Sequence, residues 1–254
     1  MTGVAFALAQ TLWILIPVAL AGMLLANRLS PAVEAVRTTG AGHRALGPSR
    51  PSVLRLSTLF ATDSFGGGFV VQSFIAYWLT VRFGATVGAL GVIFCAVGVL
   101  QTASMLLAPR LAERYGLLST MVFTHLPSNV LLAAMAFAPN FRLAVALLLA
   151  RVALSQMDVP TRQAYVMALV EPGERTAAAA YTNTARDLVR PVGPALAGAS
   201  QSVALGAPFL IAGVVKGAYD LVLWRWFRTV ELPAEDVAPA DPAALVERRI
   251  EEAP

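Results

Sequence analysis

The chain has 254 residues, of which 57% are hydrophobic and 13% are charged, with a mean hydropathy of +0.67. Soluble domains carry about 25% charged residues, so this composition excludes an ordinary water-soluble enzyme, and it is too apolar for a disordered chain. The formal net charge is +4, but the basic residues lie mainly between apolar stretches, which is the membrane pattern and not that of a nucleic-acid-binding face.

Seven stretches are long and apolar enough to cross a bilayer, because a helix needs about 20 apolar residues to span roughly 30 Å of hydrocarbon. They cover residues 4–26, 57–81, 86–108, 117–138, 141–169, 176–199 and 203–227. We predict helices because an open sheet cannot satisfy its backbone in lipid, and no alternating segments of about ten residues occur. The expected fold is an all-α, polytopic membrane bundle of about seven transmembrane helices.

The stretches divide the chain into four parts. Residues 1–27 lack a basic leader and have too long an apolar run for a signal peptide, so they are predicted to form a transmembrane helix. Residues 28–56 contain five arginines, one acid and many Gly, Pro and Ser residues, which predicts a flexible linker. Residues 57–230 form a six-helix bundle, and residues 231–254 a disordered acidic tail.

The arginines between the stretches predict the orientation. Counted on alternate sides, eleven arginines fall on one side, whereas Arg82 and Arg142 fall on the other. The arginine-rich side is expected to be cytoplasmic, as in a multi-pass protein of the plasma (inner) membrane. This places the linker and the carboxy terminus in the cytoplasm and the amino terminus outside, as expected if further helices precede the chain.

Three passages carry a family resemblance: PRLAERYG at residues 109–116, MDVPTRQAYVMALVEPGERTAA at 157–178 and RPVGPALAG at 190–198. Together they resemble the carboxy-terminal half of a major facilitator superfamily transporter, in which two six-helix halves are joined by a cytoplasmic loop. By this resemblance, residues 4–26 correspond to helix six and residues 28–56 to the central loop. The resemblance implies that an amino-terminal half is missing, or that a partner half supplies it.

The first passage resembles the family's loop motif, G-x-x-x-D-R-x-G followed by two basic residues. Glu113, Arg114 and Gly116 match the acid, the base and the second glycine. Pro109 replaces the first glycine, and two leucines replace the basic pair. The resemblance implies that the acid faces a helix amino terminus and locks one conformation. The alternative is a topological loop with the ordinary charge of the inner side.

Ionisable groups inside hydrocarbon are costly, so they indicate function by default. The residues predicted to bind substrate or couple its transport are polar or charged and lie within the apolar stretches: Asp63, Gln72, Arg151, Gln156, Asp158, Tyr181, Asn183, Arg186, Asp187 and Arg190. Asp187 and Arg190 are three residues apart and are expected to pair. Arg186 is then left to bind an anionic group or a carboxylate of another helix. The alternative is an internal ion-pair network that holds the helices together.

Further spacings favour structural roles. Asp158 could take up a proton, but a clamp to Arg162, four residues on, is favoured, and Arg151 is the better substrate-binding candidate. Lys216 and Asp220 are also four residues apart and are expected to neutralise each other locally.

The favoured function is secondary transport of a small solute by alternating access, with protons as the coupling ion and efflux as the working direction. Neither an enzymatic activity nor a cofactor is predicted, because the sequence has no Walker loop, dinucleotide fingerprint or nucleophile elbow. His43, His125 and Cys95 lack partners at ligand spacing, so no metal is expected. The alternatives are a non-transporting sensor or assembly subunit with the same fold and, disfavoured by the long linker, a retinal protein with its Schiff base on Lys216.

The lipid bilayer is therefore the first expected partner, and this generates a solubility prediction. The purified chain should need detergent to stay monodisperse, because its apolar surface cannot all face inward in water. Size-exclusion chromatography with and without detergent measures this. A folded, monodisperse chain in plain buffer would contradict the membrane assignment.

Overall fold

The computed structural model describes residues 16–17, 19–28 and 46–230. Residues 16–17 and 19–26 are helical, and they belong to a unit separate from the one that begins at His43. Most of the predicted helix at 4–26, most of the linker and the whole acidic tail therefore lie outside the described residues.

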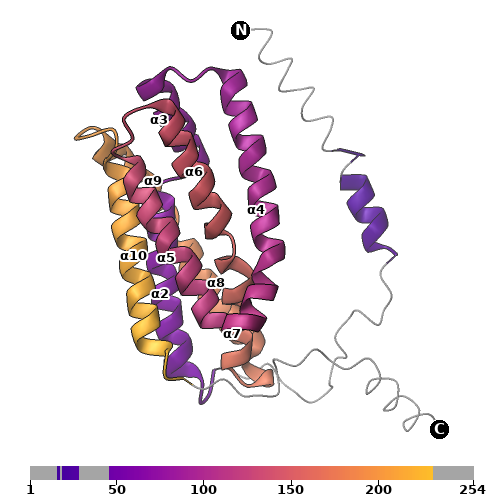
Figure 1. The fold of residues 1–254 in the computed structure, drawn as a ribbon. Helices are drawn as coiled ribbons and strands as arrows, with labels where there is room; N and C mark the ends of the chain where they lie inside the picture. The colour runs from indigo at the N-terminus through magenta and orange to yellow at the C-terminus, as the bar shows by residue number, and fades with distance from the viewer. Residues whose placement is uncertain (1–15, 18, 29–45, 231–254) are drawn as a thin grey trace, which may run out of the picture. The chain divides into compact units, whose positions relative to one another are not determined.

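Residues 46–230 form a helical bundle (Figure 1), and all regular structure in the described residues is helical. The α-helices, with one short 3₁₀ helix before α8, are α2 (Arg50–Gly68), α3 (Gln72–Phe83), α4 (Val87–Tyr115), α5 (Leu117–Met135), α6 (Phe141–Ser155), α7 (Asp158–Leu169), η2 (Pro172–Glu174), α8 (Arg175–Val189), α9 (Val192–Gln201) and α10 (Ala207–Phe227). The predicted all-α membrane fold is confirmed.

Five of these described segments are long and apolar enough to cross a membrane: α2–α3, α4, α5, α6–α7 and α10. The predicted span at 176–199 corresponds to α8 and α9, which are not among the five. Arg186, Asp187 and Arg190 lie in its middle and lower its hydropathy. Helix α2 begins at Arg50, so the helix extends into residues expected to belong to the linker.

Three predicted spans are each broken into two helices, and each break follows from local chemistry. The α2–α3 break follows the run Gly66–Gly68, and Val71 is extended with ψ 153°, as expected where glycine weakens a helix. At the α6–α7 break, Pro160 has no N–H to donate to the carbonyl of Gln156. Pro191 stands between α8 and α9 for the same reason.

Consecutive spans alternate in direction, so the turns fall at two ends of the bundle (Figure 1). The α3–α4, α5–α6 and α9–α10 turns share one end with Arg82 and Arg142, and the Arg82 Nη2 group donates to the Ala138 carbonyl at 3.2 Å. The other end holds the remaining turn and terminal arginines, Arg50, Arg55, Arg110, Arg114, Arg175, Arg225 and Arg228. Among the described residues, the fold thus gathers the arginine-rich turns at one end.

Two apolar clusters fill the bundle interior, one toward each end. The first contains Phe69 to Leu79 of α2–α3 with buried residues of α5, α6 and α10, and the Trp78 and Phe209 rings lie 4.7 Å apart. The second contains buried residues of α2, α5, α7, α8 and α10, including Phe60 and Tyr219, whose rings lie 6.4 Å apart. Along α2, α5 and α10, a short polar stretch separates the two clusters, and this stretch forms the candidate site.

Helices α2 and α9 approach each other at two glycines. A Cβ atom on Gly193 would lie 2.6 Å from the Gly68 Cα and 2.7 Å from the Phe65 carbonyl oxygen. Backbone atoms cannot rotate away as a side chain can, so only glycine fits there.

This contact generates a stability prediction. Gly193→Ala should lower the free energy of unfolding by about 1–3 kcal/mol, because the added methyl group forces α2 and α9 apart. Thermal or denaturant unfolding in detergent measures this change. The matched control is Gly198→Ala in the same helix, where an added Cβ meets no atom within 4 Å. Equal stability of the two variants would contradict the close approach.

Candidate functional site

A layer of charged and polar side chains lies between the two apolar clusters. We call this set the polar layer; its members come from α2, α5, α7 and α10, are at most 6% exposed, and comprise Asp63, His125, Asn129, Asp158, Arg162, Lys216 and Asp220. Buried charges are costly unless they are paired, so the contacts within the layer decide whether the bundle can form.

Asp63 contacts side chains from three other helices. Lys216 Nζ of α10 donates to Asp63 Oδ1, and Arg162 Nη1 of α7 lies 3.4 Å from Asp63 Oδ2. His125 Nε2 of α5 lies 3.7 Å from Asp63 Oδ1. A single carboxylate on α2 therefore links α5, α7 and α10.

Asp220 forms a second centre on α10. Its Oδ1 lies 2.8 Å from His125 Nδ1, and its Oδ2 accepts from Asn129 Nδ2 at 2.8 Å. His125 and Asn129 are one turn apart on α5, so two successive side chains of one helix bind both carboxylate oxygens. The His125 ring thus lies between Asp220 and Asp63.

Asp158 and Arg162 make the contact expected from their spacing, with Arg162 Nη1 donating to Asp158 Oδ2 at 2.7 Å. The guanidinium also stacks over the Phe60 ring, 5.4 Å from its centroid. The bond to Asp158 lies within α7, whereas the longer contact of Arg162 with Asp63 joins α7 to α2.

Two predicted local pairs are not formed in the described part of the chain. Lys216 pairs with Asp63 and not with its helical neighbour Asp220, because both side chains point into the bundle, where partners on α2 and α5 are closer. The expected Asp187–Arg190 pair is also wrong: both side chains are exposed on α8 and its end, with no ion pair between them among the described contacts. Both predictions rested on residue spacing, and spacing does not distinguish a local partner from one on another helix.

A cavity of about 240 Å³ borders the polar layer between α2, α7 and α8. Its lining includes Arg162, Gln163, Thr182, Asn183 and Arg186. The Ser64 hydroxyl donates to the Arg186 carbonyl at 3.0 Å, so the cavity lies beside Asp63 on α2. Among the described side chains, no carboxylate lies within ion-pair distance of the Arg186 guanidinium. The cavity therefore presents positive charge with amide and hydroxyl groups.

The structure separates the predicted site residues into three groups. Asp63 and Asp158 belong to the polar layer, and Asn183 and Arg186 line the cavity. Arg151 and Gln156 are half-buried on α6 and at the α6–α7 break, and the buried Arg151 Nε atom has no hydrogen-bond partner. The exposed ones are Gln72, Tyr181, Asp187 and Arg190.

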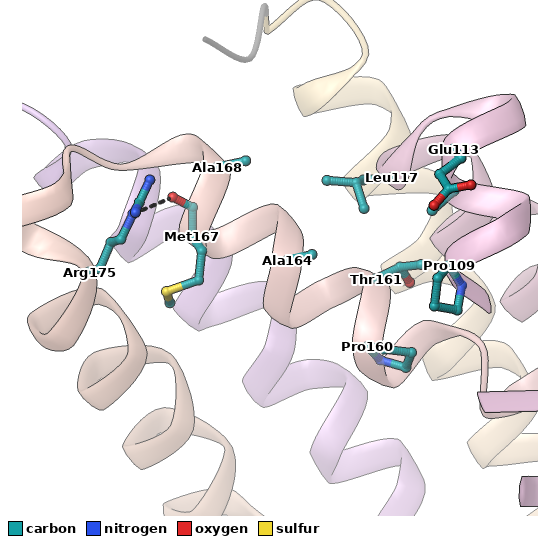
Figure 2. Close-up of a pocket in the computed structure, with 10 residues that line it drawn as sticks. Pro109, Glu113, Leu117, Pro160, Thr161, Ala164, Met167, Ala168 and Arg175 are labelled. Carbon is teal, nitrogen blue, oxygen red and sulfur yellow. Dashed lines mark hydrogen bonds between the residues drawn. The ribbon is translucent and has the colours of Figure 1, made fainter. Parts of the chain in front are cut away.

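The predicted loop motif lies at the arginine-rich end of the bundle. Glu113 lines a pocket of about 480 Å³ with Thr161 in the first turns of α7 and Arg175 at the start of α8 (Figure 2). Arg175 donates from Nε to the Met167 carbonyl at 3.2 Å, on the far wall of the pocket from Glu113. Gly116 has a φ of 85°, which favours glycine at the turn. Arg114 is exposed beside Tyr115.

The sequence matches the Major Facilitator Superfamily over residues 56–250, which covers all the described helices from α3 to α10 and most of α2. The chain belongs to the Major Facilitator Superfamily. It is thus a multi-pass membrane protein of a transporter superfamily, whose members are typically not enzymes.

A curated relative is similar over part of its length. It is the uncharacterized membrane protein YJR124C of Saccharomyces cerevisiae, 24% identical over 181 residues. The match covers 70% of this chain and 40% of the relative, so the chain spans less than half of that protein.

Sequence reasoning missed five members of the polar layer as site residues: Arg162, which was named only as a clamp for Asp158, and His125, Asn129, Lys216 and Asp220. The signal was present, since each of the apolar helices α5 and α10 carries two polar residues at i and i+4. Such a pair on one helix face predicts a polar contact with a neighbouring helix as well as a local pair.

The contacts of Asp63 with Lys216 and Arg162 generate a prediction about the stability of the bundle and the coupling between these residues. Asp63→Asn should destabilise the bundle by about 3–5 kcal/mol, because it leaves Lys216 and Arg162 buried without their shared carboxylate. Adding Lys216→Gln to Asp63→Asn should restore part of this loss. A double-mutant cycle on unfolding in detergent measures the coupling. Glu113→Gln, at an exposed acid, is the control and should change stability little; additive effects of the two layer substitutions would contradict the direct pair.

Proposed function

We propose that this chain moves a small solute across the membrane as a secondary transporter that works by alternating access, with protons as the coupling ion. The observation that carries the proposal is the cavity beside Arg186, which borders a buried layer of charged residues. Family membership supports transport in general; the solute, the coupling and the mechanism are the proposed part.

The solute is proposed to carry an anionic group. Arg186 has no carboxylate partner within ion-pair distance among the described residues, and Arg162 lines the same cavity. A guanidinium binds carboxylate or phosphate through a planar fork of N–H donors. Asn183 and Gln163 add donors and acceptors that can orient the rest of the solute. A cavity of this kind favours a small polar anion over an apolar molecule.

The broken helices support alternating access. In secondary transporters, discontinuous helices near the midplane form the site, and one bundle rocks against the other. Here the α2–α3 break after Gly66–Gly68 and the α8–α9 break at Pro191 lie on two helical segments that approach each other closely, at Gly68 and Gly193. Bending at these breaks would change the surroundings of Asp63 and Arg186 together.

The second wall of the transport path is proposed to come from an amino-terminal or partner half. Helix α8 exposes Tyr181, Asn183 and Asp187, and Arg190 is exposed just after it. Polar groups within a membrane segment are expected to face a protein interior or a water-filled cavity. We further propose that the arginine-rich end and the carboxy terminus face the cytoplasm at the plasma (inner) membrane.

The role of Arg186 is tested by transport. We expect Arg186→Ala to lower anion-dependent flux at least about tenfold, since a charged hydrogen bond contributes roughly 1.5–3 kcal/mol. The protein, with any polypeptide that co-purifies from the membrane, is reconstituted in liposomes containing a pH-sensitive dye. Acetate, lactate, succinate and inorganic phosphate are then added in turn, and the change in internal pH is recorded against protein-free liposomes.

The matched control is Arg142→Ala, which removes an exposed arginine from the start of α6, away from the cavity. It should transport as the unaltered protein does, and both variants should insert in the membrane normally. Equal flux through Arg186→Ala and the unaltered protein would remove Arg186 from the site. Flux with none of these anions would favour the non-transporting sensor or assembly subunit.

A further inference from the structure

We propose that the His125–Asp220 pair is a proton-binding site, which holds one exchangeable proton inside the bundle. The inference rests on the proposed function, since it names the residues that would carry the coupling proton. It concerns residues on α5 and α10 that were not among the predicted site residues.

The contacts of Asp220 carry the argument. Asp220 is 0% exposed, and its only polar partners among the described residues are the His125 ring and the Asn129 amide. Asn129 is neutral, so the one positive charge that can lie in contact with this carboxylate is a protonated His125. A buried carboxylate without such a charge is costly. One proton added to the imidazole removes that cost.

The second ring nitrogen of His125 also faces a carboxylate. Nδ1 lies 2.8 Å from Asp220 Oδ1, and Nε2 lies 3.7 Å from Asp63 Oδ1. A neutral imidazole that donates through Nδ1 directs the Nε2 lone pair toward Asp63, whereas an imidazolium directs an N–H at each carboxylate. The proton therefore adds at Nε2 and leaves from Nε2 to water, and no other bond is made or broken.

Charged groups on every neighbouring helix act on this site. Asp63 on α2 and Asp158 on α7 favour the added proton, whereas Lys216 on α10 and Arg162 on α7 oppose it. Lys216 and Arg162 already contact Asp63, and the His125 contact is the longest of the three. The other ionisable groups near the layer are Arg151 on α6, Arg186 on α8 and Tyr219, whose ring lies 6.0 Å from the His125 ring. Proton binding is thus set by competition for Asp63.

This competition connects the proton to the cavity. Arg162 lines the cavity and reaches Asp63 Oδ2 at 3.4 Å, a longer contact than its 2.7 Å bond to Asp158. An anion bound in the cavity attracts Arg162 and weakens its hold on Asp63. The Asp63 carboxylate, which is then less neutralised by Arg162, favours the protonated form of His125. By linkage the effect is reciprocal, so the anion and the proton bind more tightly together than separately.

The chain offers a direct test, because it contains two histidines, His43 and His125. In the His43→Gln variant, His125 is the only histidine, and its ring can be labelled with ¹⁵N. Nitrogen NMR of the reconstituted protein between about pH 5 and pH 9, the range in which histidines ionise, reports the proton directly. We expect one transition from the imidazolium pattern to a neutral ring. A ring signal that stays the same across this range would overturn the proposal.

A second variant identifies the partner. Asp220→Asn keeps the size of the side chain and removes its charge, so the His125 ring should stay neutral over most of the range. An unchanged transition in this variant would overturn the assignment of the proton to the pair. The NMR signal of the His125 ring can be measured without any transport. The NMR experiment therefore tests the proton site, and the liposome flux experiment separately tests the proposed transport function.

Discussion

The Asp63 carboxylate is the constraint on which the bundle depends. It is 4% exposed and contacts Lys216, Arg162 and His125 from three other helices. In hydrocarbon such a charge is tolerated only where its partners are fixed in place, so these polar contacts constrain the positions of α2, α5, α7 and α10 in addition to their apolar packing. The apolar clusters on either side exclude water and strengthen those contacts.

The same region combines rigid and deformable features. Gly68 and Gly193 bring the backbones of α2 and α9 together, and any side chain larger than hydrogen would separate them. At the helix breaks beside these glycines, the ladder of helical hydrogen bonds is already interrupted. The chain can therefore bend there with the loss of few hydrogen bonds. A buried charge with several ion-pair partners, placed next to a backbone that can bend, is a suitable basis for two discrete conformations. A movement of the helices must exchange one set of ion pairs for another.

The cavity and the polar layer share Arg162. This residue bonds Asp158 one turn before it, reaches Asp63 on α2 and lines the cavity beside Arg186. One guanidinium therefore joins the cavity to Asp63, which also contacts His125, without a long chain of contacts. This arrangement is the physical basis of the coupling between solute and proton that we propose.

The sequence by itself determined the membrane environment, the helical class and the approximate places of the apolar segments, because the length and hydropathy of a segment act locally. Its motifs also indicated the family that the match over residues 56–250 confirms. It identified Asp63, Asp158 and Arg186 as charges inside apolar stretches. Only the tertiary structure decided that Lys216 pairs with Asp63 and that Asp220 pairs with His125. A buried charge takes the nearest partner in space, and that partner lies on another helix, where residue spacing carries no information.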